Sequence, residues 1–212
     1  MPPPSFDDEF RRRLLELLAW RRDVRCFRRD PLPAGAVEAL LEKCSLAPSV
    51  GLSQPWRFVL VEDKARREAV ARDFAAMNAA ALAAQSADRA SRYARLKLAG
   101  LAEAPVQLAV FADPMTARGH GLGRRTMPET AEYSAVAAVH TLWLLARAEG
   151  IGMGWVSILD PAAIAAILEV PREWRLVGYF CLGYPRAEDE VPQLAREGWE
   201  ERSEPRSFIL RR

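Results

Sequence analysis

The segment from Thr130 to Glu149 constrains the fold of this chain more than any other. Its residues have helical propensity, and Gly150 follows them with the backbone freedom that ends a helix. Apolar side chains occur around much of the girth of this helix, so other structure must cover it on most sides. We therefore expect it at the centre of the fold or within an interface.

Helical and strand patterns alternate along the rest of the chain. The spacing of apolar residues predicts helices over 6–20, 34–45, 64–84, 88–101 and 160–168, and strands over 56–61, 106–111, 154–159 and 176–182. Strands separated by helices favour layers of helices packed against a sheet. We see no internal repeat and no linker, which predicts a single domain over 6–212 with an extended C-terminal segment. The first five residues, 1–5, are predicted to form a disordered tail.

The composition is that of an ordinary globular protein, and it excludes several classes. Half of the 212 residues are apolar and 27% are charged, while a net charge of +2 is too small for a general nucleic-acid binder. The N-terminus lacks the apolar core of a secretory signal, and no apolar run is long enough to cross a bilayer. Three scattered cysteines favour a reducing compartment, and neither they nor the two histidines have metal-binding spacing. We expect a cytoplasmic protein with no metal, membrane or nucleic-acid partner.

The first candidate site is Arg21-Arg22-Asp23-Val24-Arg25, just past the end of the first predicted helix. Three guanidinium groups within five residues offer the rigid donor geometry that suits phosphate. Asp23 in their midst has two interpretations. It is either a functional carboxylate or a partner that neutralises the arginines in surface ion pairs.

Two further segments have the residue types that line ligands. Residues 47–56, Ala-Pro-Ser-Val-Gly-Leu-Ser-Gln-Pro-Trp, form a turn-rich loop whose backbone can approach a ligand, with Ser49 as a polar contact. An ordinary connecting loop is the alternative. Gly152 and Gly154 would let a strand pass close to a flat ring system, and Ser157 lies near the end of that strand. The alternative for Ser157 is a hydrogen bond to the backbone within a buried strand.

Together the three segments resemble the nitroreductase family. That family has an Arg-Arg-x-x-Arg motif after its first helix, an Ala-Pro-Ser loop ending in Gln-Pro-Trp, and a Gly-x-Gly strand after a long central helix, all present here in that order. Asp23 stands where the family usually has serine. With residues 121–129 and 154–161, it makes the chain similar to the 5,6-dimethylbenzimidazole synthase branch. The resemblance implies an α+β, nitroreductase-like fold with a mixed central sheet flanked by helices, and a homodimer with the flavin at the subunit interface.

The resemblance also implies the chemistry. In this branch reduced FMN is the substrate, and O2 fragments it to 5,6-dimethylbenzimidazole and a four-carbon sugar phosphate. A separate flavin reductase would supply the reduced FMN. The implied flavin contacts are Arg21, Arg22, Asp23, Val24, Arg25, Ser49, Leu98 and Ser157. Of these, Asp23 would be the base that accepts protons, and Ser157 would orient the flavin by a hydrogen bond.

Two other functions stay open from the sequence. One is an FMN-dependent NAD(P)H nitroreductase, which needs an open face above the flavin for its second substrate. The other is a flavin-binding protein without enzymatic activity, in which Asp23 and Ser157 would be dispensable. The glycine-rich loop 113–128 is either a mobile lid over the flavin or an ordered surface loop.

Overall fold

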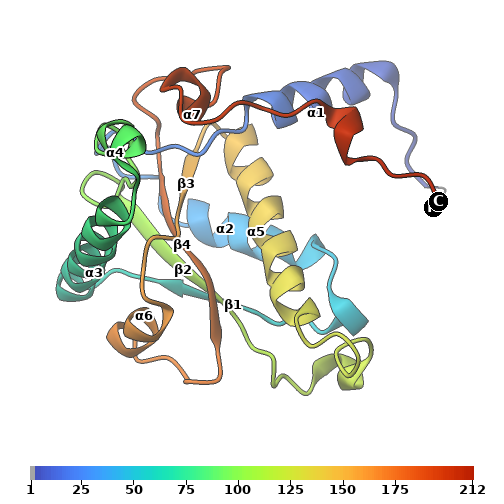
Figure 1. Ribbon diagram of the computed structural model, residues 1–212. Helices are drawn as coiled ribbons and strands as arrows, with labels where there is room; N and C mark the ends of the chain where they lie inside the picture. The colour runs from blue at the N-terminus through green and yellow to red at the C-terminus, as the bar shows by residue number, and fades with distance from the viewer. Residues whose placement is uncertain (1–2) are drawn as a thin grey trace.

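The computed structural model describes residues 3–212 (Figure 1). The strands are β1 (Trp56–Leu60), β2 (Val106–Ala112), β3 (Gly152–Val156) and β4 (Arg175–Gly183). The helices are α1 (Asp8–Trp20), α2 (Ala36–Lys43), α3 (Lys64–Ala83), α4 (Ala87–Tyr93), α5 (Thr130–Ala148), α6 (Pro161–Ile167) and α7 (Gln193–Arg196). The strands form one sheet in the order β1-β2-β4-β3.

The sheet is buried on both faces, which gives the molecule three layers. Along β2, Leu108 and Val110 face a core shared with α2 and α5, whereas Ala109 and Phe111 face a core shared with α3 and α6. This alternation follows from the two-residue period of a strand. Figure 1 shows α5 on one side of the sheet and α3 and α6 on the other. The expected α+β architecture is confirmed.

The sheet is expected to be mixed, but among the described residues its parallel pairing is limited to one bridge at the edge. All the strand pairs that the structure describes are antiparallel. Within residues 3–212 the one parallel pairing is an isolated bridge between Asp23 and Met153 of β3. The chain after α1 therefore joins the sheet through a single bridge instead of a full strand.

The long apolar helix α5 lies at the centre of the fold, as its sequence predicts. Eight of its 19 residues are buried, among them Ala138, Leu142 and Ala146. It packs against β1, β2, β3 and β4 and against α1 and α2. One stripe of α5 is left open, where Tyr133 is 58% exposed and Val136 is 40% exposed.

Three predicted elements have different bounds in the structure. The helix predicted over 88–101 ends at Tyr93, and the chain beyond it is not helical where Gly100 passes against the ring of Phe27. A Cβ on Gly100 would lie 2.4 Å from that ring. The strand predicted over 154–159 is β3, which starts at Gly152 and ends before Ser157. The C-terminal segment is not fully extended, since it carries α7 and a short 3₁₀ turn at Pro205–Phe208.

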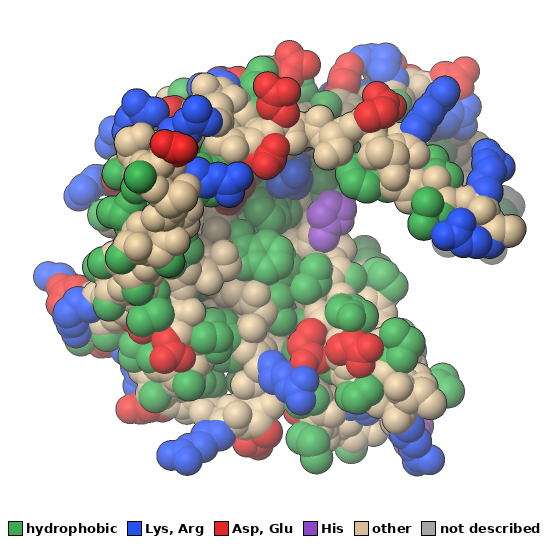
Figure 2. All heavy atoms as spheres, viewed as in Figure 1, with side chains coloured by type: hydrophobic (Ala, Val, Ile, Leu, Met, Phe, Trp, Pro, Cys, Tyr) green, Lys and Arg blue, Asp and Glu red, His purple; other side chains and the backbone are tan. Residues whose placement is uncertain are grey.

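Helix α1 and the C-terminal residues form an arm that projects from the layers (Figures 1 and 2). No residue of α1, all of which the structure describes, is buried by its own chain. Figure 2 shows a wide notch beneath this arm. Met1 and Pro2 of the predicted tail lie outside the described residues, while residues 3–5 are exposed and have no helix or strand. Among the described residues, none of the helices combines the length and apolarity that crossing a bilayer requires.

The second core makes a direct prediction about stability. Ile164 of α6 is fully buried between α3 and the sheet. Ile164→Ala should lower the free energy of unfolding by about 2–5 kcal/mol, because it removes buried methyl groups and leaves a cavity. Urea denaturation followed by circular dichroism measures the change. Glu173→Ala, at an exposed position in the turn after α6, should change it by no more than about 0.5 kcal/mol. Equal effects of the two variants would contradict the packing of α6.

Candidate active site

The segment Arg21–Arg25 runs along the open edge of β3. Helix α1 ends at Trp20, and Arg21 adopts an extended conformation. The backbone N–H of Val24 donates to the carbonyl of Met153 at 3.0 Å. At Gly154 the approach is so close that a Cβ would lie 2.0 Å from the carbonyl oxygen of Val24. The prediction that this glycine faces a flat ring system is therefore wrong, because the neighbouring backbone fills its space.

Asp23 is held at both of its carboxylate oxygens. Its Oδ1 accepts a hydrogen bond from the backbone N–H of Trp155 at 2.8 Å. Its Oδ2 accepts from Nε and Nη2 of Arg25 at 3.1 and 2.8 Å. The side chain nevertheless remains 31% exposed. A carboxylate has about four lone-pair sites, so Oδ1, with one donor, can accept a further hydrogen.

Arg25 links Asp23 to a distant segment of the chain. Its Nη1 donates to the carbonyl of Lys97 at 3.2 Å, and its side chain is only 12% exposed. The bond brings Lys97 and the adjacent Leu98 to the site of Asp23. The donors of Arg25 are thus directed at protein acceptors, and its expected contact with phosphate stays a prediction.

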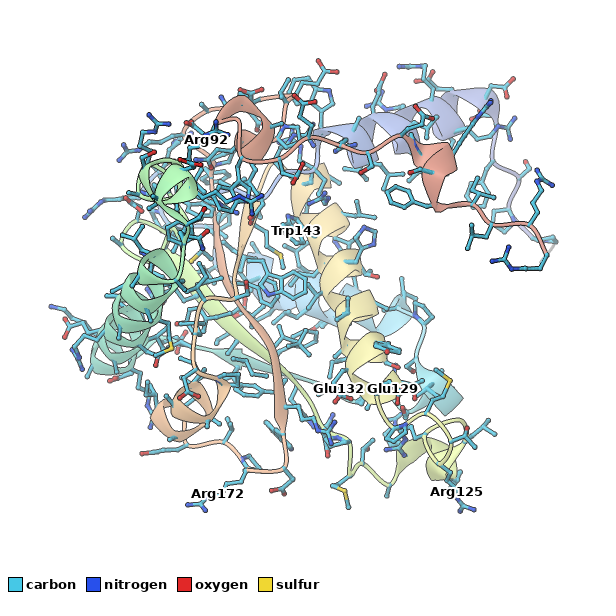
Figure 3. All side chains as sticks on the ribbon, in the orientation of Figure 1. Arg92, Arg125, Glu129, Glu132, Trp143 and Arg172 are labelled. Atoms are coloured by element: carbon cyan, nitrogen blue, oxygen red, sulfur yellow. The ribbon has the colours of Figure 1, made fainter. Side chains whose placement is uncertain are left out.

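Arg21 and Arg22 line a cavity of about 290 Å³ between the Arg21–Cys26 segment and residues 187–202. The guanidinium carbon of Arg21 lies 4.8 Å from the ring centroid of Trp143, which points from α5 toward the sheet (Figure 3). Arg22 donates to the backbone carbonyls of Asp189 and Glu190. These contacts fix the C-terminal segment over the arginine motif.

Positive charge is in excess in this cavity. Five arginines line it, Arg21, Arg22, Arg25, Arg196 and Arg202, against only Asp23 and Asp189. Burial lowers the pKa of Arg21, and the positive charge of Arg202 lowers it further against the opposing effect of Asp23. Burial also lowers the pKa of Arg22. The positive charges of Arg202 and Arg21 lower it further. A bound anion would relieve this repulsion, so the arrangement favours a phosphate.

Arg202 is the member of this cluster that the sequence did not reveal. It forms no ion pair or hydrogen bond with any residue in 3–212. The chain contains 30 lysines and arginines, so one more arginine in a polar C-terminal segment carried no signal. Arg202 is identified only from the fold, which places the C-terminal segment against the arginine motif.

Ser157 lies in the same region as Asp23. It directly follows β3 and is two residues beyond Trp155, a separation of about 7 Å along an extended chain. Its side chain is exposed and makes no hydrogen bond to any described residue. The alternative of a backbone-bonded serine in a buried strand is therefore not realised.

Ser49 lies apart from the other predicted residues. The amide next to it, Val50 N–H, donates to Oγ of Ser134 on α5 at 3.0 Å. The arginine motif meets α5 elsewhere, where Nε1 of Trp143 donates to the carbonyl of Arg22 at 3.0 Å. These two contacts are nine residues apart on α5, or about 13 Å along its axis. The structure thus brings together the residues of the arginine motif with Leu98 and Ser157, and places Ser49 in a second location.

The part of the chain that the structure describes has no group of three or more His, Cys, Asp and Glu side chains placed to hold a metal ion. The candidate site therefore consists of an arginine-lined cavity, one accessible carboxylate and an exposed serine.

Gly154 offers a test of the backbone contact that positions this site. In Gly154→Ala the new methyl group would meet the rigid carbonyl of Val24, so the Arg21–Arg25 segment must move. We expect the affinity for FMN, the ligand that the resemblance implies, to fall by about tenfold or more, since such overpacking costs about 1–3 kcal/mol. Fluorescence titration measures the affinity.

Gly152→Ala is the matched control in the same strand. The nearest atom to its methyl group would be Cγ2 of Val24, at 2.9 Å, which is a side-chain atom and less fixed than the backbone carbonyl that Gly154→Ala meets at 2.0 Å. A larger loss of affinity in Gly152→Ala than in Gly154→Ala would contradict the proposed role of the contact.

Comparison with known proteins identifies the family. The model described as the Nitroreductase family matches residues 18–184. The chain is 58% identical over 199 residues to a 5,6-dimethylbenzimidazole synthase of Rhodospirillum rubrum, covering 94% of each chain. It is 46% identical to a 5,6-dimethylbenzimidazole synthase of Rhodobacter capsulatus, over 93% of this chain and 95% of the relative.

Among solved structures, oxidized iodotyrosine deiodinase bound to FMN and 3-iodo-L-tyrosine is similar with a TM-score of 0.73 and 24% identity, over 93% of this chain and 97% of that one. At this identity the likeness is one of fold. The match to the family model spans most of the sequence, and the two synthases are similar over nearly their whole length. The chain therefore belongs to the nitroreductase family.

Proposed function

We propose that this chain is a 5,6-dimethylbenzimidazole synthase, which fragments reduced FMN with O2. The similarity to synthases over nearly the whole length supports this activity. The single structural observation that carries it is Asp23, an accessible carboxylate held beside an arginine-lined cavity. A carboxylate at this point supplies a proton acceptor that the serine usual in the family does not.

The arginine cavity would bind the phosphate of FMN. Arg21, Arg22 and Arg202 supply the excess positive charge, because Arg25 is paired with Asp23 and Arg196 with Asp189. The volume of about 290 Å³ is at the small end for a ligand pocket, so it suits the phosphate and part of the ribityl chain. The flavin ring would then extend past Asp23 toward Leu98 and Ser157.

The flavin itself supplies the reactivity with O2 when it is bound in its reduced form. The residues of the chain bind it, orient it and move protons. Asp23 would accept a proton at the free lone pair of Oδ1, while the Trp155 N–H and Arg25 fix the plane of the carboxylate. The exposed hydroxyl of Ser157 would donate a hydrogen bond that orients the flavin.

Replacement of Asp23 tests the proposal. Purified protein is incubated in air with chemically reduced FMN, and 5,6-dimethylbenzimidazole is measured by mass spectrometry. Asp23→Asn retains an oxygen that can accept from Trp155 N–H, so FMN binding should persist. Product formation should fall by about 100-fold or more, because the general base is lost.

Asp30→Asn serves as the control, since Asp30 is an exposed aspartate paired with Arg28. It should leave the yield unchanged. Undiminished product in Asp23→Asn would exclude Asp23 as the base. If the unmodified protein only reoxidises FMN, the synthase proposal fails, and turnover of NAD(P)H with a nitroaromatic compound would identify a nitroreductase instead.

We further infer that two copies of the chain form a homodimer with the flavin between them. Several large apolar side chains of α1 are only partly covered by their own chain, including Phe10, Leu14 and Leu15 at 45%, 40% and 66% exposed. Helix α5, which carries the open stripe, borders the notch beneath the arm (Figures 1 and 2). Ser49 is far along α5 from the arginine cavity, so it would reach the flavin bound by the second copy. Each of the two sites would then take its arginine cavity from one copy and its Ser49 from the other.

A separate flavin reductase would provide the reduced FMN. In the proposed reaction the flavin is consumed instead of recycled, so every turnover requires a new reduced molecule. We propose that another protein carries out this reduction, which would leave this site to binding and proton transfer.

Mixed dimers test whether Ser49 acts across the interface. Arg22→Ala should weaken phosphate binding, and Ser49→Trp should block the flavin ring, so each variant alone should make little product. If Ser49 acts on the second copy, a mixed dimer contains one intact site, and co-expressed variants should regain about a quarter of the unmodified activity. If Ser49 acts within its own chain, every site carries one defect and co-expression restores nothing. Tagging the two variants differently isolates the mixed dimers.

A further inference from the structure

The loop that carries Ser49 has a backbone that cannot hold its shape alone. Leu52 and Gln54 adopt left-handed conformations with φ values of 52° and 45°, which are unfavourable for side chains of this kind. Oγ of Ser49 accepts from the backbone N–H of Gln54 at 3.1 Å, which closes the loop on itself. Strained conformations of this type persist only where surrounding structure enforces them.

Residues 113–128 provide that surrounding structure on one side. A Cβ on Gly119 would lie 2.6 Å from the carbonyl oxygen of Gly51, and a Cβ on Gly123 would lie 2.6 Å from Cγ2 of Val50. The glycines of this segment thus allow two loops to interlock, and the shape of one depends on the shape of the other. Ser134 of α5 supports the Ser49 loop from a second side through Val50 N–H.

Arg124 holds the 113–128 segment closed. Its Nη1 donates to the carbonyl of Pro114 at 2.9 Å. Its Nη2 donates to the carbonyls of Thr116 and Arg118, each at 2.8 Å. One partly buried guanidinium group therefore donates hydrogen bonds to three carbonyls in residues 114–118, at the start of the same loop. Only the planar, five-donor head of arginine can make this set of bonds.

We propose that Arg124 is a positioning residue for flavin binding, acting through the Ser49 loop. It fixes residues 113–128 as a rigid platform, and the platform keeps the strained Ser49 loop in the conformation that contacts the flavin. This inference rests on the proposed function for the role of Ser49. It also assigns the glycine-rich loop as an ordered support in place of a mobile lid.

The test compares two adjacent arginines. Arg125 makes no side-chain hydrogen bond to any described residue, and Figure 3 shows it at the outer edge of the loop, pointing away from the molecule. Arg124→Ala and Arg125→Ala remove the same charge, but only Arg124→Ala also removes a partly buried side chain and its three carbonyl bonds. Arg124→Ala should weaken FMN binding by about tenfold, whereas Arg125→Ala should change it by less than about twofold.

Hydrogen exchange distinguishes positioning from a general loss of stability. In Arg124→Ala, amides in 49–54 should exchange at least about tenfold faster, although they lie some 70 residues away in sequence, while those of β2 and β4 should be unchanged. Added guanidinium ion should restore both the slow exchange and part of the FMN affinity. Arg124→Lys should fail to rescue fully, because an ammonium group cannot span the three carbonyls.

The outcomes separate this inference from the proposed function. Unchanged exchange at 49–54 in Arg124→Ala would overturn the link between the two loops, whatever the protein catalyses. Faster exchange with unaltered FMN affinity would overturn the role in flavin binding. Absence of 5,6-dimethylbenzimidazole from the unmodified protein would instead refute the synthase proposal and leave the exchange result standing.

Discussion

The contact between Val24 and Gly154 is the constraint on which the site depends. It lets the chain after α1 lie against the edge of β3 so closely that no side chain can stand between them. The backbone bond from Val24 to Met153 fixes the register, and the carboxylate of Asp23 then meets the N–H of Trp155. Arg25, Lys97 and the arginine cavity all take their positions from this edge.

The site combines two kinds of electrostatic environment. In the cavity, arginines from both ends of the chain repel one another, and a bound phosphate would provide the missing negative charge. At Asp23 the charges are balanced within the protein, because Arg25 is paired with it. Under the proposed function, binding energy would be concentrated at the phosphate, which does not react, while the carboxylate beside the reacting part of the ligand is already oriented.

The sequence predicted the elements that depend on local pattern. The bounds of α3 and α5 agree with their apolar spacing to within one residue, and Asp160 caps α6 as expected. What it could not predict depends on contacts across the fold. Helical propensity continued past Tyr93, but α4 ends there, and Gly100 farther along passes closely against the ring of Phe27. Arg202 lines the arginine cavity and Ser49 lies away from it. Both positions depend on the tertiary fold and not on local sequence pattern.

The bridge between Asp23 and Met153 is made by main-chain atoms of Val24, and the side chain at position 23 adds the ion pair with Arg25 and its bond to Trp155 N–H. A serine hydroxyl can accept that same bond. Exchange of Asp23 for serine would therefore keep the backbone register of the sheet edge and remove the ion pair with Arg25. Under the proposed function, a change of reaction type would need no new architecture, since one side chain on an unchanged backbone register would decide whether a base stands beside the flavin.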